Sequence, residues 1–180
     1  MTSLNPSESA TNASKTTTRN HLTIHVTDDQ DDVQLDMMRY QQLATAVLDR
    51  QGVNRASELS VIFVSSNVIA ELNQQHMGHQ GPTDVLAFPI DEHATQPQDT
   101  SDTPLLLGDV VICPSVAADN CSSNNNSYPG HRGTVTDEID LLVVHGILHV
   151  LGMDHADEHE QQQMQKSERT HLAAFRESEI

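Results

Sequence analysis

The chain has 180 residues, of which 36% are hydrophobic and 3% aromatic, and its formal net charge at pH 7 is -17. This length fits one domain with a core of its own. The acid excess argues against loose, charge-driven binding to nucleic acid, because such binding relies on Lys and Arg to neutralise phosphates. The acid excess does not exclude a local basic groove.

Other compositional features exclude further classes of protein. No apolar run reaches the roughly 18 residues of a membrane span. The N-terminus lacks the apolar region of a signal peptide, so we expect a cytoplasmic protein with no membrane partner. Cys113 and Cys121 are too few and too poorly spaced for a disulfide framework or a four-cysteine zinc site. We expect Cys113 to be a small buried hydrophobe.

The predicted elements alternate along the chain. Residues 1–20 are rich in Ser, Thr and Asn, which predicts a disordered tail, and residues 21–180 are expected to form a single domain. Apolar patterning predicts strands at 21–26, 59–64, 84–89 and 105–112, with Gly108 marking a bulge or a close approach. Helices are predicted at about 32–51, 66–76 (capped by Ser66), 114–120 and 157–175. An exposed polar insertion is expected at 91–103, and a mobile polar stretch at 121–133. The interspersed pattern favours an α+β fold with a small mixed sheet.

A further helix, buried and apolar, is predicted from about Thr136 to about Leu151. Thr136 is a suitable N-cap, and the acidic residues that follow it favour the positive helix N-terminus. Gly152 stands where a helix would end in a left-handed turn.

This helix carries a candidate metal site. His145 and His149 are four residues apart, so both rings project from one helix face. The turn at Gly152 allows the chain to double back, so that His155 supplies a third nitrogen. Three protein ligands and an open position are typical of catalytic zinc, which lowers the pKa of a bound water to about 7.

The spacing matches the metzincin protease motif H-E-x-x-H-x-x-G-x-x-H at every position but one. Gly146 replaces the glutamate that serves those proteases as general base. Glycine inside a helix costs about 1 kcal/mol relative to alanine. Its presence therefore indicates that a neighbouring strand or a substrate approaches closely at this position.

The histidine spacing alone is a weak signal. The chain has 11 histidines, and the same spacing recurs at His21 and His25 and at His155 and His159. The alternative is that the three histidines cap or line the core, but unpaired imidazoles are a costly filling for a core. The full motif on an apolar helix favours metal binding.

Three stretches together resemble the YbeY family of bacterial endoribonucleases that mature ribosomal RNA. They are the segment from Leu72-Asn73 to 82–89 (PTDVLAFP), residues 107–113 (LGDVVIC), and residues 145–155 with Asp154. The resemblance covers roughly residues 60–175. It implies a zincin-like α+β fold, one Zn²⁺ bound by His145, His149 and His155, and cleavage of single-stranded RNA. It also implies a role in 3′-end maturation of small-subunit ribosomal RNA and in ribosome quality control, with a ribosome or ribosomal-protein partner.

The chain departs from the family pattern at two positions. Met77 stands where the family usually has an arginine that meets RNA phosphate, and Ala87 replaces a usual serine. Arg132 or His76 are candidates to replace that arginine.

No side chain is assigned as general base. Asp154 is a candidate to orient a histidine, and Asp84 and Asp109 are strand carboxylates that could reach the site. Two other functions stay open: a metzincin-like metalloprotease, and a non-catalytic zinc-containing protein that binds RNA or ribosomes.

Overall fold

The computed structural model describes residues 22–53, 56–90, 104–122 and 131–179. Its elements are β1 (Leu22–Asp29), α1 (Met37–Arg50), β2 (Ser57–Val64), α2 (Ser66–Met77), β3 (Val85–Pro89), β4 (Leu105–Ile112), α3 (Pro114–Ser122), α4 (Val135–Val150) and α5 (Glu158–Ser178). The predicted tail at 1–20 and the predicted insertion at 91–103 lie outside the described residues. Within the described ranges, no helix has the length and apolar character needed to cross a membrane.

The four strands form a mixed sheet in the order β1-β2-β4-β3. β1 and β4 run parallel to β2, whereas β3 runs antiparallel to β4 and forms an edge. The register between β2 and β4 shifts between Glu58, which pairs with Leu106, and Leu59, which pairs with Gly108. Gly108 has φ +148°, and a Cβ there would lie 2.2 Å from the main-chain oxygen of Phe88. The bulge and the close approach predicted at Gly108 are therefore both present.

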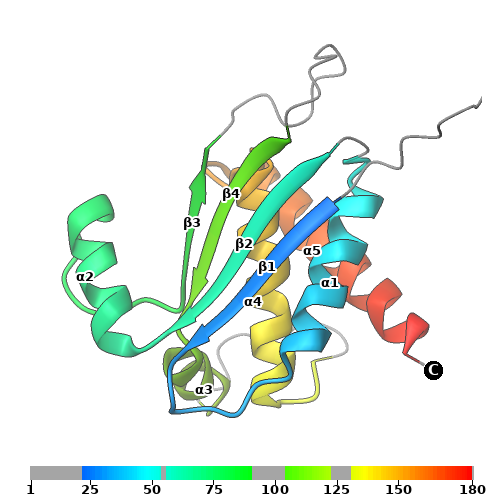
Figure 1. Cartoon of the computed structure of the whole chain (residues 1–180). Coiled ribbons are helices and arrows are strands. Elements are labelled where there is room, and N and C mark those ends of the chain that lie inside the picture. Colours follow the sequence, from blue (N-terminus) through cyan, green and yellow to red (C-terminus); the bar gives the residue numbers. More distant parts are fainter. Residues whose placement is uncertain (1–21, 54–55, 91–103, 123–130, 180) are drawn as a thin grey trace, which may run out of the picture.

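The helices lie on both faces of the sheet, with α4 at the centre of the larger layer. Figure 1 shows α4 running along the sheet with α1 and α5 beside it, and α2 set apart next to β3. The main core joins α1, α4 and α5 to the inner side chains of the strands, including Val61 and Val110. A smaller cluster joins Ile69 of α2 to the opposite side of the sheet and includes Cys113, which is buried as predicted. The structure thus confirms an α+β fold with a small mixed sheet packed against helices.

Three predicted helix starts were wrong. α4 begins two residues early, with Thr134 rather than Thr136 as its N-cap, because the Thr134 hydroxyl accepts a hydrogen bond from the main-chain N–H of Asp137 (3.1 Å). α2 is preceded by Ser65 rather than Ser66, and Ser65 makes no side-chain capping bond. The first long helix begins at Met37 rather than near residue 32, because Asp36 accepts a bond from the N–H of Arg39 and acts as its cap.

Candidate metal centre

The C-terminal end of α4 reverses the chain sharply. Gly152 has φ +90°, a left-handed backbone conformation that ends the helix. The main-chain N–H of Met153 donates to the carbonyl of Leu148 (2.9 Å) and stabilises this turn. The next helix then begins with a capping box between Asp157 and Glu160. A Glu160 carboxylate oxygen also accepts the N–H of Ala156 (3.1 Å), directly after the third histidine. These bonds fix the backbone on both sides of residues 153–155.

The structure brings the three predicted histidines together. Their ring centroids are 4.5 Å apart for His145 and His149, 4.9 Å for His149 and His155, and 5.7 Å for His145 and His155. One ligand atom from each residue lies within 4.8 Å of the others, and the Nε2 atoms of His145 and His149 are 3.1 Å apart. Two nitrogens of a tetrahedral zinc site stand about 3.3 Å apart at ordinary bond lengths. The donor set and its spacing fit a divalent metal such as zinc.

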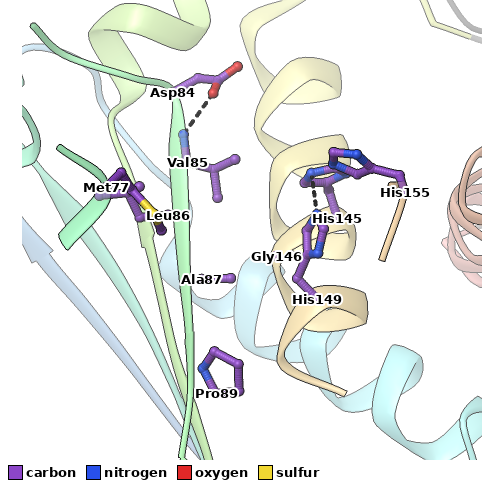
Figure 2. A pocket seen from close by; sticks show the side chains of 10 residues that line it. All are labelled: Met77, Asp84, Val85, Leu86, Ala87, Pro89, His145, Gly146, His149 and His155. Carbon is purple, nitrogen blue, oxygen red and sulfur yellow. Dashed lines mark hydrogen bonds between the residues drawn. The ribbon is translucent and has the colours of Figure 1, made fainter. Parts of the chain in front are cut away.

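The histidines form one wall of a cleft of about 360 Å³ between α4 and the edge strand β3. Figure 2 shows the imidazoles facing Val85, Ala87 and Pro89 across this space. The described residues that line the cleft are Met77, Asp84, Val85, Leu86, Ala87, Pro89, His145, Gly146, His149 and His155. These described residues include no Lys or Arg, so an anion bound among them would meet the histidines, a metal held by them, or the main chain of β3.

Gly146 is a contact point between α4 and the sheet. A Cβ built on Gly146 would lie 2.3 Å from Cγ1 of Val110, a fully buried residue of β4. Such a separation is far below van der Waals contact, so α4 can lie this close to the sheet only with glycine here. The sequence predicted that either a neighbouring strand or a substrate approaches Gly146 closely, and in the structure it is the neighbouring strand β4.

The surroundings of His149 favour its neutral form, the form that metal binding requires. Burial, followed by the nearby His145 and His155, lowers the pKa of His149 below its ordinary value. A metal-ligating histidine must present a free lone pair, so a lowered pKa favours metal binding near neutral pH.

A carboxylate from α5 contacts the site, and the sequence did not predict it. Glu168 lies with an oxygen 2.7 Å from Nδ1 of His145. Asp154 was the predicted partner for a histidine ring, but it is exposed and accepts the main-chain N–H of His155 (2.7 Å). Asp154 therefore shapes the loop, and Glu168 contacts a ring. The available signal was the position of Glu168 between Met164 and Leu172, on the buried stripe of α5.

Asp84 and Asp109, the two strand carboxylates, differ in position. Asp84 lines the cleft, but one of its oxygens accepts the N–H of Val85 (2.9 Å) and the other accepts the side-chain amide of Asn120 (3.0 Å). Asp109 does not line the cleft. Asp84 is thus engaged in holding the start of β3.

The candidates to replace the missing arginine lie outside the cleft. Arg132 pairs with Asp137 (2.8 Å) at the start of α4, whereas the histidines lie towards its other end. The His76 ring lies edge-on to Phe88, with centroids 5.0 Å apart. Met77 itself lines the cleft and is 46% exposed.

Comparison with known proteins identifies the family. The family model described as Endoribonuclease YbeY matches residues 25–176. The chain belongs to the YbeY family. A curated Endoribonuclease YbeY of Salinispora tropica is 43% identical over 74% of this chain and 84% of its own length. That of Thermobifida fusca is 42% identical over 81% of this chain and 90% of its own length. The predicted family is confirmed, and with it the predicted class of enzyme, an RNA-cleaving hydrolase, at the level of the family.

A solved structure supports the fold assignment. The solution structure of TM1509 from Thermotoga maritima matches this YbeY family member with a TM-score of 0.53 and 26% sequence identity. The match covers 87% of this chain and 93% of TM1509. The arrangement of sheet and helices described above is therefore shared with a protein solved by experiment.

Proposed function

We propose that this chain is a zinc-dependent endoribonuclease that cuts single-stranded RNA. The observation that carries the proposal is the convergence of His145, His149 and His155 in an open cleft of a YbeY-family chain. In this proposal the three histidines bind one zinc ion per chain. The RNA strand binds in the cleft beside them.

The chain's own residues have defined tasks in this proposal. The three histidines hold the metal, and β3 forms the opposite wall against which the RNA lies. Zinc with three protein ligands supplies an activated water near neutral pH and stabilises charge that develops on a phosphate oxygen. Both carboxylate oxygens of Asp84 already accept hydrogen bonds from other residues of the chain, so we do not assign Asp84 as general base. No other general base is assigned.

We also propose that the fold is zincin-like and that residues 21–180 form one hydrolase domain. The support is the placement of a histidine-bearing helix against a mixed sheet whose edge strand runs antiparallel to its neighbour. In this arrangement the metal ligands of α4 face the edge strand across the cleft (Figure 2).

The metalloprotease alternative is disfavoured at Gly146. That reaction needs a carboxylate at this position as general base. Gly146 has no side chain, and the space next to it is filled by Val110. The cleft therefore lacks the proton acceptor of the metzincin mechanism.

In the cell, we propose that the chain matures the 3′ end of small-subunit ribosomal RNA and takes part in ribosome quality control. The chain has a net charge of -17, and the part of the cleft that the structure describes has no Lys or Arg, so its electrostatic attraction to RNA is small. A ribosome or ribosomal-protein partner would supply the missing attraction. A cytoplasmic location follows from this substrate and stays a prediction.

A paired cleavage assay tests the enzymatic proposal. Purified protein is incubated with a fluorescent single-stranded RNA and, separately, with fluorescent casein, each with zinc, with chelator, and with zinc restored. The expected result is RNA cleavage that chelator removes and zinc restores, with casein intact. Casein turnover with intact RNA would favour the protease. Binding of RNA without cleavage in every condition would favour the non-catalytic protein.

Matched histidine variants test the site. Elemental analysis should give about one zinc per chain, and His149→Ala should lose both the metal and RNA cleavage. The control is His159→Ala, because His159 is an exposed histidine of α5 that shares the same sequence spacing with His155. Undiminished zinc in His149→Ala would place the ligands elsewhere. For the cellular role, the same enzymes are tested on a small-subunit ribosomal RNA with an extended 3′ end.

A further inference from the structure

Glu168 is a carboxylate in a core position. Along α5 it stands four residues after Met164 and four before Leu172, so the three side chains share one helix face. Met164 and Leu172 are 2% and 1% exposed, and Glu168 is 9% exposed. A carboxylate is rarely buried unless it is paired. Its partner here is the ring of His145, 2.7 Å away, on the neighbouring helix α4.

This contact determines which nitrogen of His145 carries the hydrogen. A carboxylate can only accept, so Nδ1 of His145 is the donor. In the neutral ring the lone pair is then on Nε2, the atom that lies 3.1 Å from Nε2 of His149. The ring is thus oriented with its free nitrogen towards the other two histidines.

We propose that Glu168 is a positioning residue of the metal centre: it fixes the tautomer and orientation of His145 and strengthens Nε2 as a metal donor. The proposal rests on the metal site proposed above. A carboxylate behind a ligating histidine raises the basicity of that ligand, and loss of such a partner typically costs roughly 10- to 100-fold in metal affinity.

The position of Glu168 on an apolar stripe allows a sharp test with Glu168→Leu. Leucine suits the surroundings of Met164 and Leu172, so the variant should retain or increase its thermal stability. Its zinc affinity, measured by competition with a coloured chelator, should fall roughly 10- to 100-fold. A second variant, Glu168→Gln, keeps an acceptor without the charge and should show a smaller loss.

The matched control is Glu177→Gln, which removes the same charge from an exposed position of the same helix. Its zinc affinity should equal that of the unmodified protein. Equal zinc affinity in Glu168→Leu and in this control, or a loss of stability without a loss of affinity, would overturn the proposal and leave Glu168 a structural residue.

Nitrogen-15 NMR of the metal-free protein gives a readout that does not depend on zinc. The His145 ring should be protonated at Nδ1 in the unmodified protein and should shift towards the Nε2-protonated form in Glu168→Leu. An unchanged His145 tautomer would also overturn the proposal. If the unmodified protein binds no zinc but the tautomer shift occurs, the proposed function fails while the positioning by Glu168 stands.

Discussion

Gly146 and Val110 are in such close contact that a single added carbon would not fit between them. The Cβ of any other residue at 146 would lie 2.3 Å from Cγ1 and 3.2 Å from Cγ2 of Val110. Val110 is a β-branched residue at the centre of the sheet, with little freedom to move aside. This contact sets how closely the histidine-bearing helix lies against β4.

Gly146→Ala should therefore destabilise the protein, although alanine is the better helix former. Overpacking a well-filled core typically costs about 1–3 kcal/mol, and the gain in helix propensity offsets at most about 1 kcal/mol. With the full offset, the net loss in the free energy of unfolding should be up to about 2 kcal/mol, measured by urea denaturation.

Val110→Ala provides the control, because it removes both methyl groups that the new Cβ would meet. In that background the nearest neighbour of the new Cβ is the Cβ of residue 110, 3.3 Å away. Gly146→Ala should then be neutral or stabilising by up to about 1 kcal/mol, because the large overlap is gone and the gain in helix propensity stays. A stabilising effect of Gly146→Ala in the unmodified background would show that the helix can move away from the sheet at no cost.

Local patterns in the sequence predicted much of this fold and site. The apolar run at 105–112, the glycine at 108 and the histidine motif each depend on residues close in the chain, and the structure contains the strand, the bulge and the histidine cluster. The contact between Glu168 and His145 joins residues 23 positions apart on two helices. The spacing of Glu168 from Met164 and Leu172 places it on the apolar stripe of α5, but only the packing of α5 against α4 shows which side chain it meets.

The start of α4 was missed for a similar reason. Thr134 and Thr136 are both suitable caps by type, and neighbours in space decide between them. The carboxylate of Asp137 accepts bonds from Arg132 and from Arg176 of α5, each 2.8 Å long. These bonds place Asp137 inside the first helical turn, which leaves Thr134 at the capping position.

Asp137 should contribute a stability that disappears in acid. Its side chain is fully buried. Burial acts to raise its pKa, but hydrogen bonds from Arg132 and Thr134 and the charge of Arg176 outweigh burial and hold the pKa well below its ordinary range. The contribution is therefore fully present above the unfolded-state pKa of about 3.9 and is lost as the pH falls towards the folded-state value.

Asp137→Asn should lower the free energy of unfolding at pH 7 by about 3 kcal/mol, the lower end of the cost of breaking a buried ion pair. The difference from the unmodified protein should shrink between pH 4 and pH 2.5, as followed by chemical denaturation at each pH. Asp36→Asn is the control, because asparagine caps α1 as well as aspartate does. A pH-independent difference would contradict the ionised state of Asp137.

Zinc should stabilise the folded protein through the three histidines. A ligand that binds only the folded state at 100 times its Kd adds about 2.7 kcal/mol. The midpoint of thermal unfolding should therefore rise on addition of zinc to the metal-free protein. The rise should be absent in His149→Ala and retained in His159→Ala. An equal rise in both variants would mean that zinc binds outside the cluster.

Met77→Arg should strengthen the binding of single-stranded RNA. Met77 lines a cleft whose described residues include no Lys or Arg, and its side chain is partly exposed at the end of α2. One exposed ionic contact contributes up to about 1 kcal/mol, so the Kd should fall by about twofold to fivefold at low salt. One additional phosphate contact on a single strand should also steepen the salt dependence of log Kd by about 0.7.

Met38→Arg is the matched control for this charge change. Met38 is 67% exposed on α1 and does not line the cleft, so it adds the same charge elsewhere on the protein. Fluorescence anisotropy at several salt concentrations measures both variants. If Met38→Arg changes the Kd and its salt dependence as much as Met77→Arg does, the effect comes from net charge alone. A change confined to Met77→Arg would instead place RNA phosphate in the cleft that Met77 lines together with the three histidines.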